Sequence, residues 1–191
     1  GIAMQIKDAN KSRRGSIVLA AVCLALQVMI SPNIGMGNGR INFALIFAAV
    51  YALTYGGKSA VVVGFFAGLV YDLLATNPIG LMAGLLTILS YALGREERDR
   101  FADGTVSVLS AFGTGSFLAI GGYHLAMILL GDSSSVVDLL MLRILPTFAM
   151  TFLGFLPFAY LELRRVAKAR GKHVGAKSHG LRENYYDIRN L

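Results

Sequence analysis

Three ionisable side chains lie inside long apolar stretches of the sequence: Asp72, His124 and Arg143. In a bilayer such a side chain is costly unless it finds a polar partner, so these residues are candidates for a functional role. His124 has no second histidine or thiol at metal-ligand spacing, and we expect no metal site. The sequence carries no P-loop, nucleophile elbow or paired-carboxylate motif. We therefore expect a protein that is not an enzyme, uses no cofactor, and holds these three residues for structure or partner binding.

The composition indicates a membrane protein. Of the 191 residues, 55% are hydrophobic and only 15% are charged, and the mean hydropathy is +0.60. A single soluble core of this size could not bury that much apolar surface. The one cysteine, Cys23, lies in an apolar run, which leaves no disulfide framework.

Six apolar segments alternate with short polar connections, and we expect each to be a transmembrane helix. They comprise residues 16–30, 41–56, 59–75, 79–94, 105–130 and 137–161. Four contain only about 15–17 residues, near the lower limit for a hydrocarbon layer of ~30 Å. Gly1-Ile-Ala before Met4 is interpreted as an expression or processing remnant, and the first span as a retained signal anchor.

The basic residues set the expected orientation. With the N-terminus in the cytoplasm, 16 of the 18 Lys and Arg residues lie on the cytoplasmic side, while Arg40 lies on an outer loop and Arg143 in a span. The predicted fold is an all-α integral membrane bundle of six helices with both termini cytoplasmic. Residues 1–15 form a cytoplasmic N-terminus, 16–161 the membrane domain and 162–191 a basic cytoplasmic tail.

This topology places Asp72, His124 and Arg143 in the outer third of the membrane, roughly 5–9 Å below its surface. We expect an Asp72–Arg143 ion pair with His124 or Tyr123 nearby. The alternative is that Arg143 extends to the outer interface without contacting Asp72. Pro146 and Pro157 are expected to bend the last span.

Glycines at four-residue spacing mark two of the spans. Gly64 and Gly68 share a helix face with Asp72, and Gly80 and Gly84 begin a similar face that continues to Tyr91. Small residues at this spacing let two helix backbones approach closely. We expect both faces to be packing surfaces.

The segment from Arg164 to Leu191 supplies most of the net charge of +7. We expect it to be disordered in solution and drawn to anionic headgroups. The basic residues closest to the last span are Arg164, Arg165, Lys168, Arg170 and Lys172. No nucleic-acid recognition module accompanies this charge, so we expect no nucleic-acid partner.

The run Gly64-Phe-Phe-Ala-Gly68-Leu-Val-Tyr71-Asp72, continuing through Asn77-Pro78-Ile-Gly80-Leu, resembles the signature of the rod-shape-determining MreD family. The Leu142-Arg143-Ile-Leu-Pro146 start of the last span is also similar. The resemblance implies a component of the cell-elongation complex in the bacterial cytoplasmic membrane. It implies binding to an MreC-like bitopic protein and links to the MreB cytoskeleton and a RodA-type synthase with its transpeptidase.

A second class stays open. The substrate-binding S-components of energy-coupling-factor vitamin transporters are six-span proteins of similar size, and the MreD resemblance implies an S-component-like fold. Ala21 and Ala25 provide a small-x-x-x-small pattern of the kind those proteins use for docking. The glycine-rich loop from Ser31 to Arg40 is the candidate for a lid over a ligand.

Overall fold

The computed structural model describes residues 2–36, 39–75, 78–95, 100–131 and 135–188. The regular elements follow each other as α1 (Ile2–Met29), β1 (Gly35–Met36), β2 (Gly39–Arg40), α2 (Phe43–Tyr55), α3 (Gly57–Leu74), α4 (Leu81–Leu93), η1 (Arg100–Asp103), α5 (Thr105–Leu129), α6 (Val136–Leu139), η2 (Leu140–Ile144) and α7 (Leu145–Ile188). η1 is a 3-10 turn and η2 a π-helical turn, and α6, η2 and α7 form one continuous rod.

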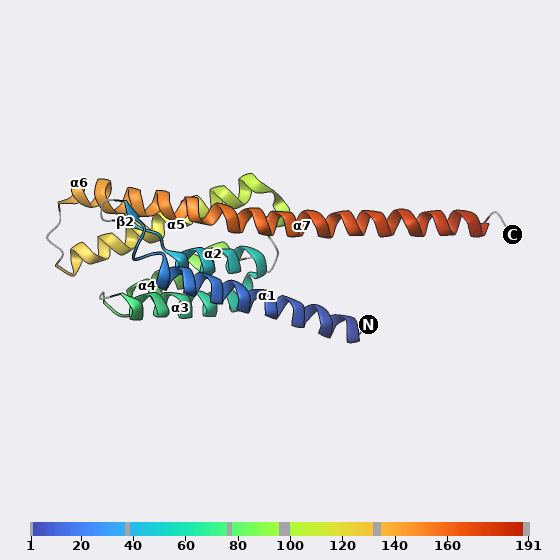
Figure 1. Ribbon diagram of the computed structural model, residues 1–191, viewed down its shortest axis with the longest axis horizontal. Coiled ribbons are helices and arrows are strands. Elements are labelled where there is room, and N and C mark those ends of the chain that lie inside the picture. The colour runs from blue at the N-terminus through green and yellow to red at the C-terminus, as the bar shows by residue number, and fades with distance from the viewer. Residues whose placement is uncertain (1, 37–38, 76–77, 96–99, 132–134, 189–191) are drawn as a thin grey trace.

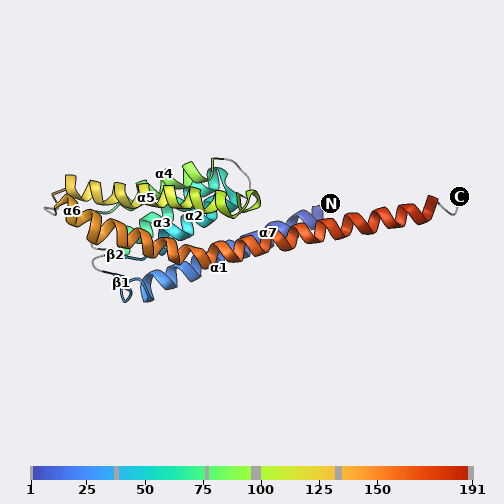
Figure 2. The same cartoon turned by 90° about the horizontal axis from the view of Figure 1, so that it is seen from above.

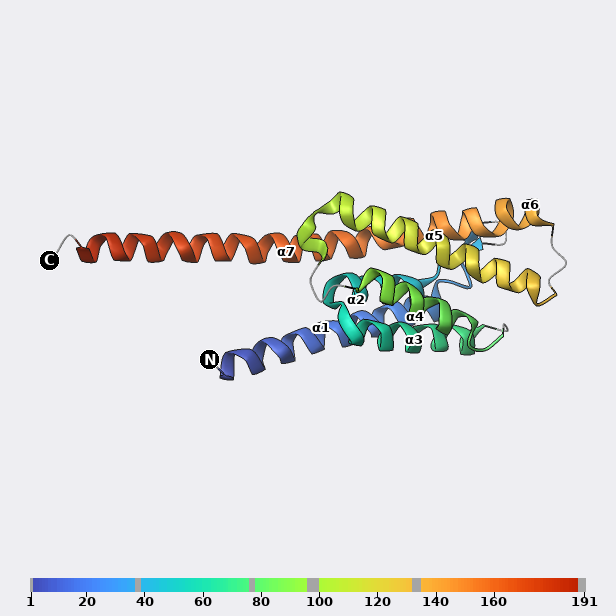
Figure 3. The ribbon, with the colours of Figure 1, turned by 180° about the vertical axis from the view of Figure 1, so that it is seen from behind.

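The helices alternate in direction along the bundle. The β1–β2 hairpin, the end of α3 and the end of α5 lie at one end, here called the hairpin end (Figures 1 and 3). The start of α1 and the second half of α7 extend from the opposite end, here called the tail end (Figure 2). All six predicted segments are therefore helical, and the helix boundaries lie close to those expected apart from the extensions of α1 and α7.

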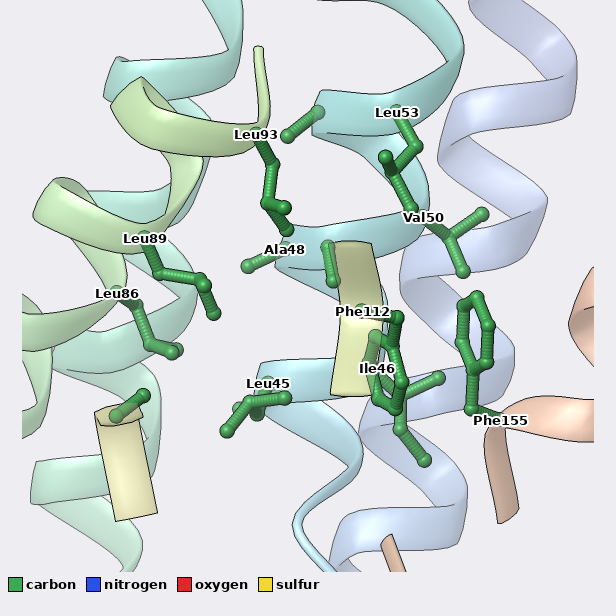
Figure 4. Packing of buried hydrophobic residues seen from close by; sticks show 14 of the residues in the cluster. Leu45, Ile46, Ala48, Val50, Leu53, Leu86, Leu89, Leu93, Phe112 and Phe155 are labelled. Atoms are coloured by element: carbon green, nitrogen blue, oxygen red, sulfur yellow. The ribbon is translucent and has the colours of Figure 1, made fainter. Parts of the chain in front are cut away.

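α2 is the central element of the bundle. It contacts α1, α3, α4, α5 and α7, and ten of its 13 residues are buried. A helix that is apolar on all sides belongs inside a protein rather than on its surface. Figure 4 shows Ile46 and Val50 of α2 beside Phe112 of α5 and Phe155 of α7. The two phenyl rings stack with their centroids 3.7 Å apart.

The outside of the bundle is apolar, as expected for a membrane protein. Phe66, Ile88, Leu118 and Leu153, on four different helices, each expose more than half of their surface. Among the residues that the structure describes, three stretches are long and apolar enough to cross a membrane: Gly57–Leu74, Thr105–Leu129 and Val137–Lys168. The apolar helices Arg14–Met29, Phe43–Tyr55 and Leu81–Leu93 are shorter. The protein is thus an all-α membrane protein.

The basic tail differs from expectation. α7 continues without interruption through Pro157 and on to Ile188, so the expected disorder is wrong for residues 164–188. Helix nucleation is the costly step, and here the membrane segment has already provided the nucleus. Each following residue adds a hydrogen bond at little further cost, and no proline follows Pro157 to stop it.

Candidate functional site at the hairpin end

A cavity of about 820 Å³ opens at the hairpin end. Its walls come from β1 and β2, the end of α3, the second half of α5, and the η2–α7 junction. The polar side chains that line it are Arg40, Asn42, Tyr71, Tyr123, His124, Arg143 and Thr147. Cavities that bind small molecules usually fall between about 300 and 1,000 Å³, so this one has the size of a ligand site.

Two of the three predicted ionisable residues meet at this cavity. His124 on α5 and Arg143 on η2 both line it, together with Tyr123. The Tyr123 ring contacts that of Tyr71 edge-on, with centroids 6.3 Å apart, which joins α5 to α3 across the cavity. Arg143 lies on the π-helical turn. Such turns often occur at functional sites because they shift the helix register locally.

The β2 strand packs against α7 along one wall of the cavity. A Cβ atom on Gly39 would lie 2.7 Å from the Cβ of Pro146, so only glycine lets β2 lie this close to α7. The Arg40 backbone N–H donates to Thr147 Oγ1 at 3.3 Å. The Asn42 backbone N–H donates to Thr151 Oγ1 at 3.2 Å, and Ser31 Oγ donates to the Ile41 carbonyl at 2.7 Å. These bonds hold the Arg40 backbone at the cavity mouth.

Asp72 does not form the expected ion pair with Arg143. Its side chain is fully buried, and its carboxylate accepts hydrogen bonds from three backbone N–H groups at the start of α4. The N–H of Gly80 lies 2.9 Å from Oδ2, that of Ala83 3.1 Å from Oδ2, and that of Met82 3.2 Å from Oδ1. The first N–H groups of a helix have no partner within it and carry a partial positive charge. These N–H groups, and not the Arg143 guanidinium, therefore compensate the charge of the Asp72 carboxylate.

The glycine face of α3 brings Asp72 to this position. A Cβ on Gly64 would lie 2.6 Å from the Leu86 carbonyl oxygen, and a Cβ on Gly68 would lie 2.6 Å from the Ala83 nitrogen. The predicted close packing is confirmed for this face. Because α3 touches the backbone of α4 directly, the carboxylate of Asp72, one turn after Gly68, reaches the N-terminus of α4.

The second glycine face behaves differently from expectation. Gly80 has φ of +100°, a left-handed conformation that favours glycine, and serves as the turn residue before α4. Gly84 is exposed, and a Cβ there would have no atom within 4 Å. Gly84 is therefore not part of the helix packing within this chain, and its face of α4 is open to lipid or a partner.

Comparison with known families decides the assignment. The sequence model of the rod shape-determining protein MreD matches residues 14–163, most of the chain. The protein belongs to the MreD family. No curated protein and no solved structure matches it. Family membership implies a role in rod shape determination, and with the apolar helices it indicates a multi-pass protein of the inner membrane.

Within this MreD-family fold, the motif that suggested the family is one local structure. Gly64 and Gly68 set the α3–α4 distance, Asp72 caps α4, and Gly80 makes the turn between them. The glycines and Asp72 of the signature thus encode a helical hairpin.

Sequence reasoning missed the other residues of the cavity. Arg40 is the one basic residue on an expected outer loop, and this position is the only feature of the sequence that singles it out. Asn42, Tyr71 and Thr147 gave no comparable signal because each lies in a separate segment. Only the packing of β2, α3 and α7 brings them together.

Proposed function

We propose that this protein is a non-enzymatic membrane component of the bacterial cell-elongation complex. It would span the membrane six times with both termini in the cytoplasm and bind an MreC-like bitopic protein. Through that contact it would couple the MreB cytoskeleton to a RodA-type synthase and its transpeptidase. The observation that carries this proposal is the MreD match, which extends over the whole bundle.

The short length of α2 is compatible with its crossing the membrane inside the bundle. α2 has only 13 residues, about 20 Å, but protein surrounds it, so its length need not match the lipid. The Arg164 guanidinium lies 4.6 Å from the centre of the Tyr160 ring. Aromatic and basic residues concentrate at membrane interfaces, so this pair supports an interface at the tail end.

We expect the exposed face around Gly84 to be the contact with the bitopic partner. Small residues favour helix association in lipid because they let backbones come close. Gly84→Leu should therefore reduce the amount of an MreC-like protein that co-purifies with the chain several-fold. The measurement is quantitative affinity co-purification from membranes in which both proteins are expressed.

The matched control for this experiment is Gly121→Leu on α5, where a Cβ also has no atom within 4 Å. It should leave co-purification unchanged. Equal losses for the two variants would contradict a specific contact at α4. Failure of the wild-type chain to retain any MreC-like protein would contradict the proposed function itself.

The proposed orientation has its own test. In a chain whose Cys23 is replaced by alanine, Asn33→Cys places an exposed thiol at the hairpin end. Ser178→Cys places a thiol on the far part of α7. A membrane-impermeant maleimide added to spheroplasts should label the first and spare the second until the cells are lysed. The reverse pattern would invert the topology.

The straight course of α7 limits which basic residues could contact lipid. Residue 172 lies about 18 Å beyond Tyr160 along the helix axis. Electrostatic attraction falls off over about 8 Å at physiological salt. We therefore propose headgroup contact for Arg164 and Arg165, and leave the later turns, including Lys168 and residues 170 and 172, for cytosolic partners.

The cavity favours a second candidate function, that of a substrate-binding S-component for a water-soluble vitamin. Its volume of about 820 Å³ would accommodate such a molecule. Native mass spectrometry of the protein purified from cells discriminates between the two. A stoichiometric water-soluble molecule would favour the transporter class, and a retained MreC-like protein would favour the scaffold.

A further inference from the structure

The hairpin-end cavity is lined with cationic side chains. Arg40 on β2 and Arg143 on η2 contribute guanidinium groups, and His124 on α5 contributes an imidazole. Among the lining residues that the structure describes, none is a carboxylate, because the Asp72 oxygens face the start of α4 instead. Two arginines beside hydrogen-bonding side chains such as Asn42, Tyr123 and Thr147 form an environment suited to a phosphate or carboxylate.

A smaller pocket of about 200 Å³ opens from the side of this cavity. The two share Pro32, Arg40, Tyr71, Leu74 and Ala75. The smaller one adds Gln27 and Val28 from the end of α1 and Ser31 just beyond it. The polar cavity therefore adjoins a space between the ends of α1 and α3.

An apolar groove lies next to that space, between the same two helices. The groove has a volume of about 200 Å³ and shares Gln27 and Tyr71 with the side pocket. Its walls are Ala20, Cys23 and Leu24 on α1 and Val63, Phe66, Ala67 and Val70 on α3, with Ala44 and Phe47 of α2 as its floor. Cavity, side pocket and groove thus adjoin one another in a row, here called the α1–α3 track, with two arginines at one end and an apolar lining at the other.

The length of the track identifies the kind of occupant. From Ser31 to Ala20 the α1 wall covers about 16 Å, roughly half of a ~30 Å hydrocarbon core. A transmembrane helix of a partner would need the full thickness. A single lipid occupies one leaflet and combines an anionic head with an apolar chain.

We propose that the α1–α3 track binds one anionic phospholipid from the leaflet at the hairpin end. The phosphate would lie in the cavity between Arg40 and Arg143, and one acyl chain would follow the groove past Ala67. The lipid enters sideways through the pocket between the ends of α1 and α3. This proposal does not depend on the proposed function, since it rests on the lining of the three spaces alone.

The test is lipid titration of the delipidated full-length protein, read by native mass spectrometry. Phosphatidylglycerol should bind at one copy per chain and about tenfold more tightly than phosphatidylcholine, which has the same chains but no net charge. Arg40→Gln should weaken phosphatidylglycerol binding about tenfold, the effect of losing one charge-assisted contact. Arg95→Gln makes the same charge change at an exposed residue of the opposite end and should have no effect.

The apolar half of the track has its own matched pair. Ala67→Phe fills the groove and should weaken phosphatidylglycerol binding. Val62→Phe adds the same ring to α3 at a residue that is 54% exposed and should not. Melting temperatures from circular dichroism show whether each variant is folded. Arg40→Lys, which keeps the positive charge, should retain most of the phosphatidylglycerol binding.

Three results would overturn the proposal. Equal binding of phosphatidylglycerol and phosphatidylcholine would show an unselective apolar crevice. Glycerol phosphate binding as tightly as the lipid would show a site for a free soluble anion. Absence of a stoichiometric phosphatidylglycerol complex would exclude the site.

Discussion

Gly68→Leu is expected to destabilise the protein by about 3 kcal/mol, the upper end of the usual cost of overpacking. The new side chain would meet the backbone of Ala83 and Met82, which cannot rotate away as a side chain could. α3 and α4 would have to separate, and Asp72 would lose its reach to the start of α4. The measurement is thermal unfolding in detergent, followed by a thiol-reactive dye on Cys23, which is 2% exposed in the folded chain.

Gly84→Leu provides the matched control for this prediction. It introduces the same side chain in a neighbouring helix at a position with no atom within 4 Å of the new Cβ. The melting temperature should stay the same or rise slightly, because leucine is a better helix former than glycine by about 0.8 kcal/mol. Equal destabilisation by the two substitutions would mean that α3 and α4 are not in backbone contact.

Asp72→Ala is expected to cost about 3 kcal/mol in the free energy of unfolding. The substitution leaves three N–H groups at the start of α4 without their acceptor, two of them buried, and hydrogen bonds to a charged group contribute about 1.5–3 kcal/mol. Asp72→Asn keeps one acceptor oxygen and loses the charge that favours the helix N-terminus, so its cost should be roughly half. The same Cys23 assay measures both.

Two comparisons make the Asp72 prediction specific. Asp138→Asn removes a carboxylate from an exposed position of α6 and should leave the melting temperature unchanged. A double-mutant cycle of Asp72→Asn with Arg143→Gln should show additive effects, because the structure places no bond between these side chains. A coupling above about 1 kcal/mol would restore the ion pair expected from the sequence.

The sequence predicted the helices well for a clear physical reason. Apolar segments broken by glycine, proline and charge are decided by local composition, and the boundaries of α2, α3 and α5 lie within a few residues of those expected. The close packing of Gly64 and Gly68 was also predictable, because helical periodicity alone places them on one face with Asp72. The helical tail does not follow from its own polar composition, because it continues a helix that the preceding membrane segment has already nucleated.

What the sequence by itself determined, then, is the class of molecule: a helical membrane protein with three ionisable residues in its apolar segments, all near one end. The tertiary structure decided what each of those residues does. Asp72 binds the start of α4 because α3 and α4 touch, whereas His124 and Arg143 face a cavity completed by Arg40 from a distant loop. The depth of a residue follows from its place along its own helix, but its partner depends on which helices are neighbours, and that is set by the packing of the whole bundle around α2.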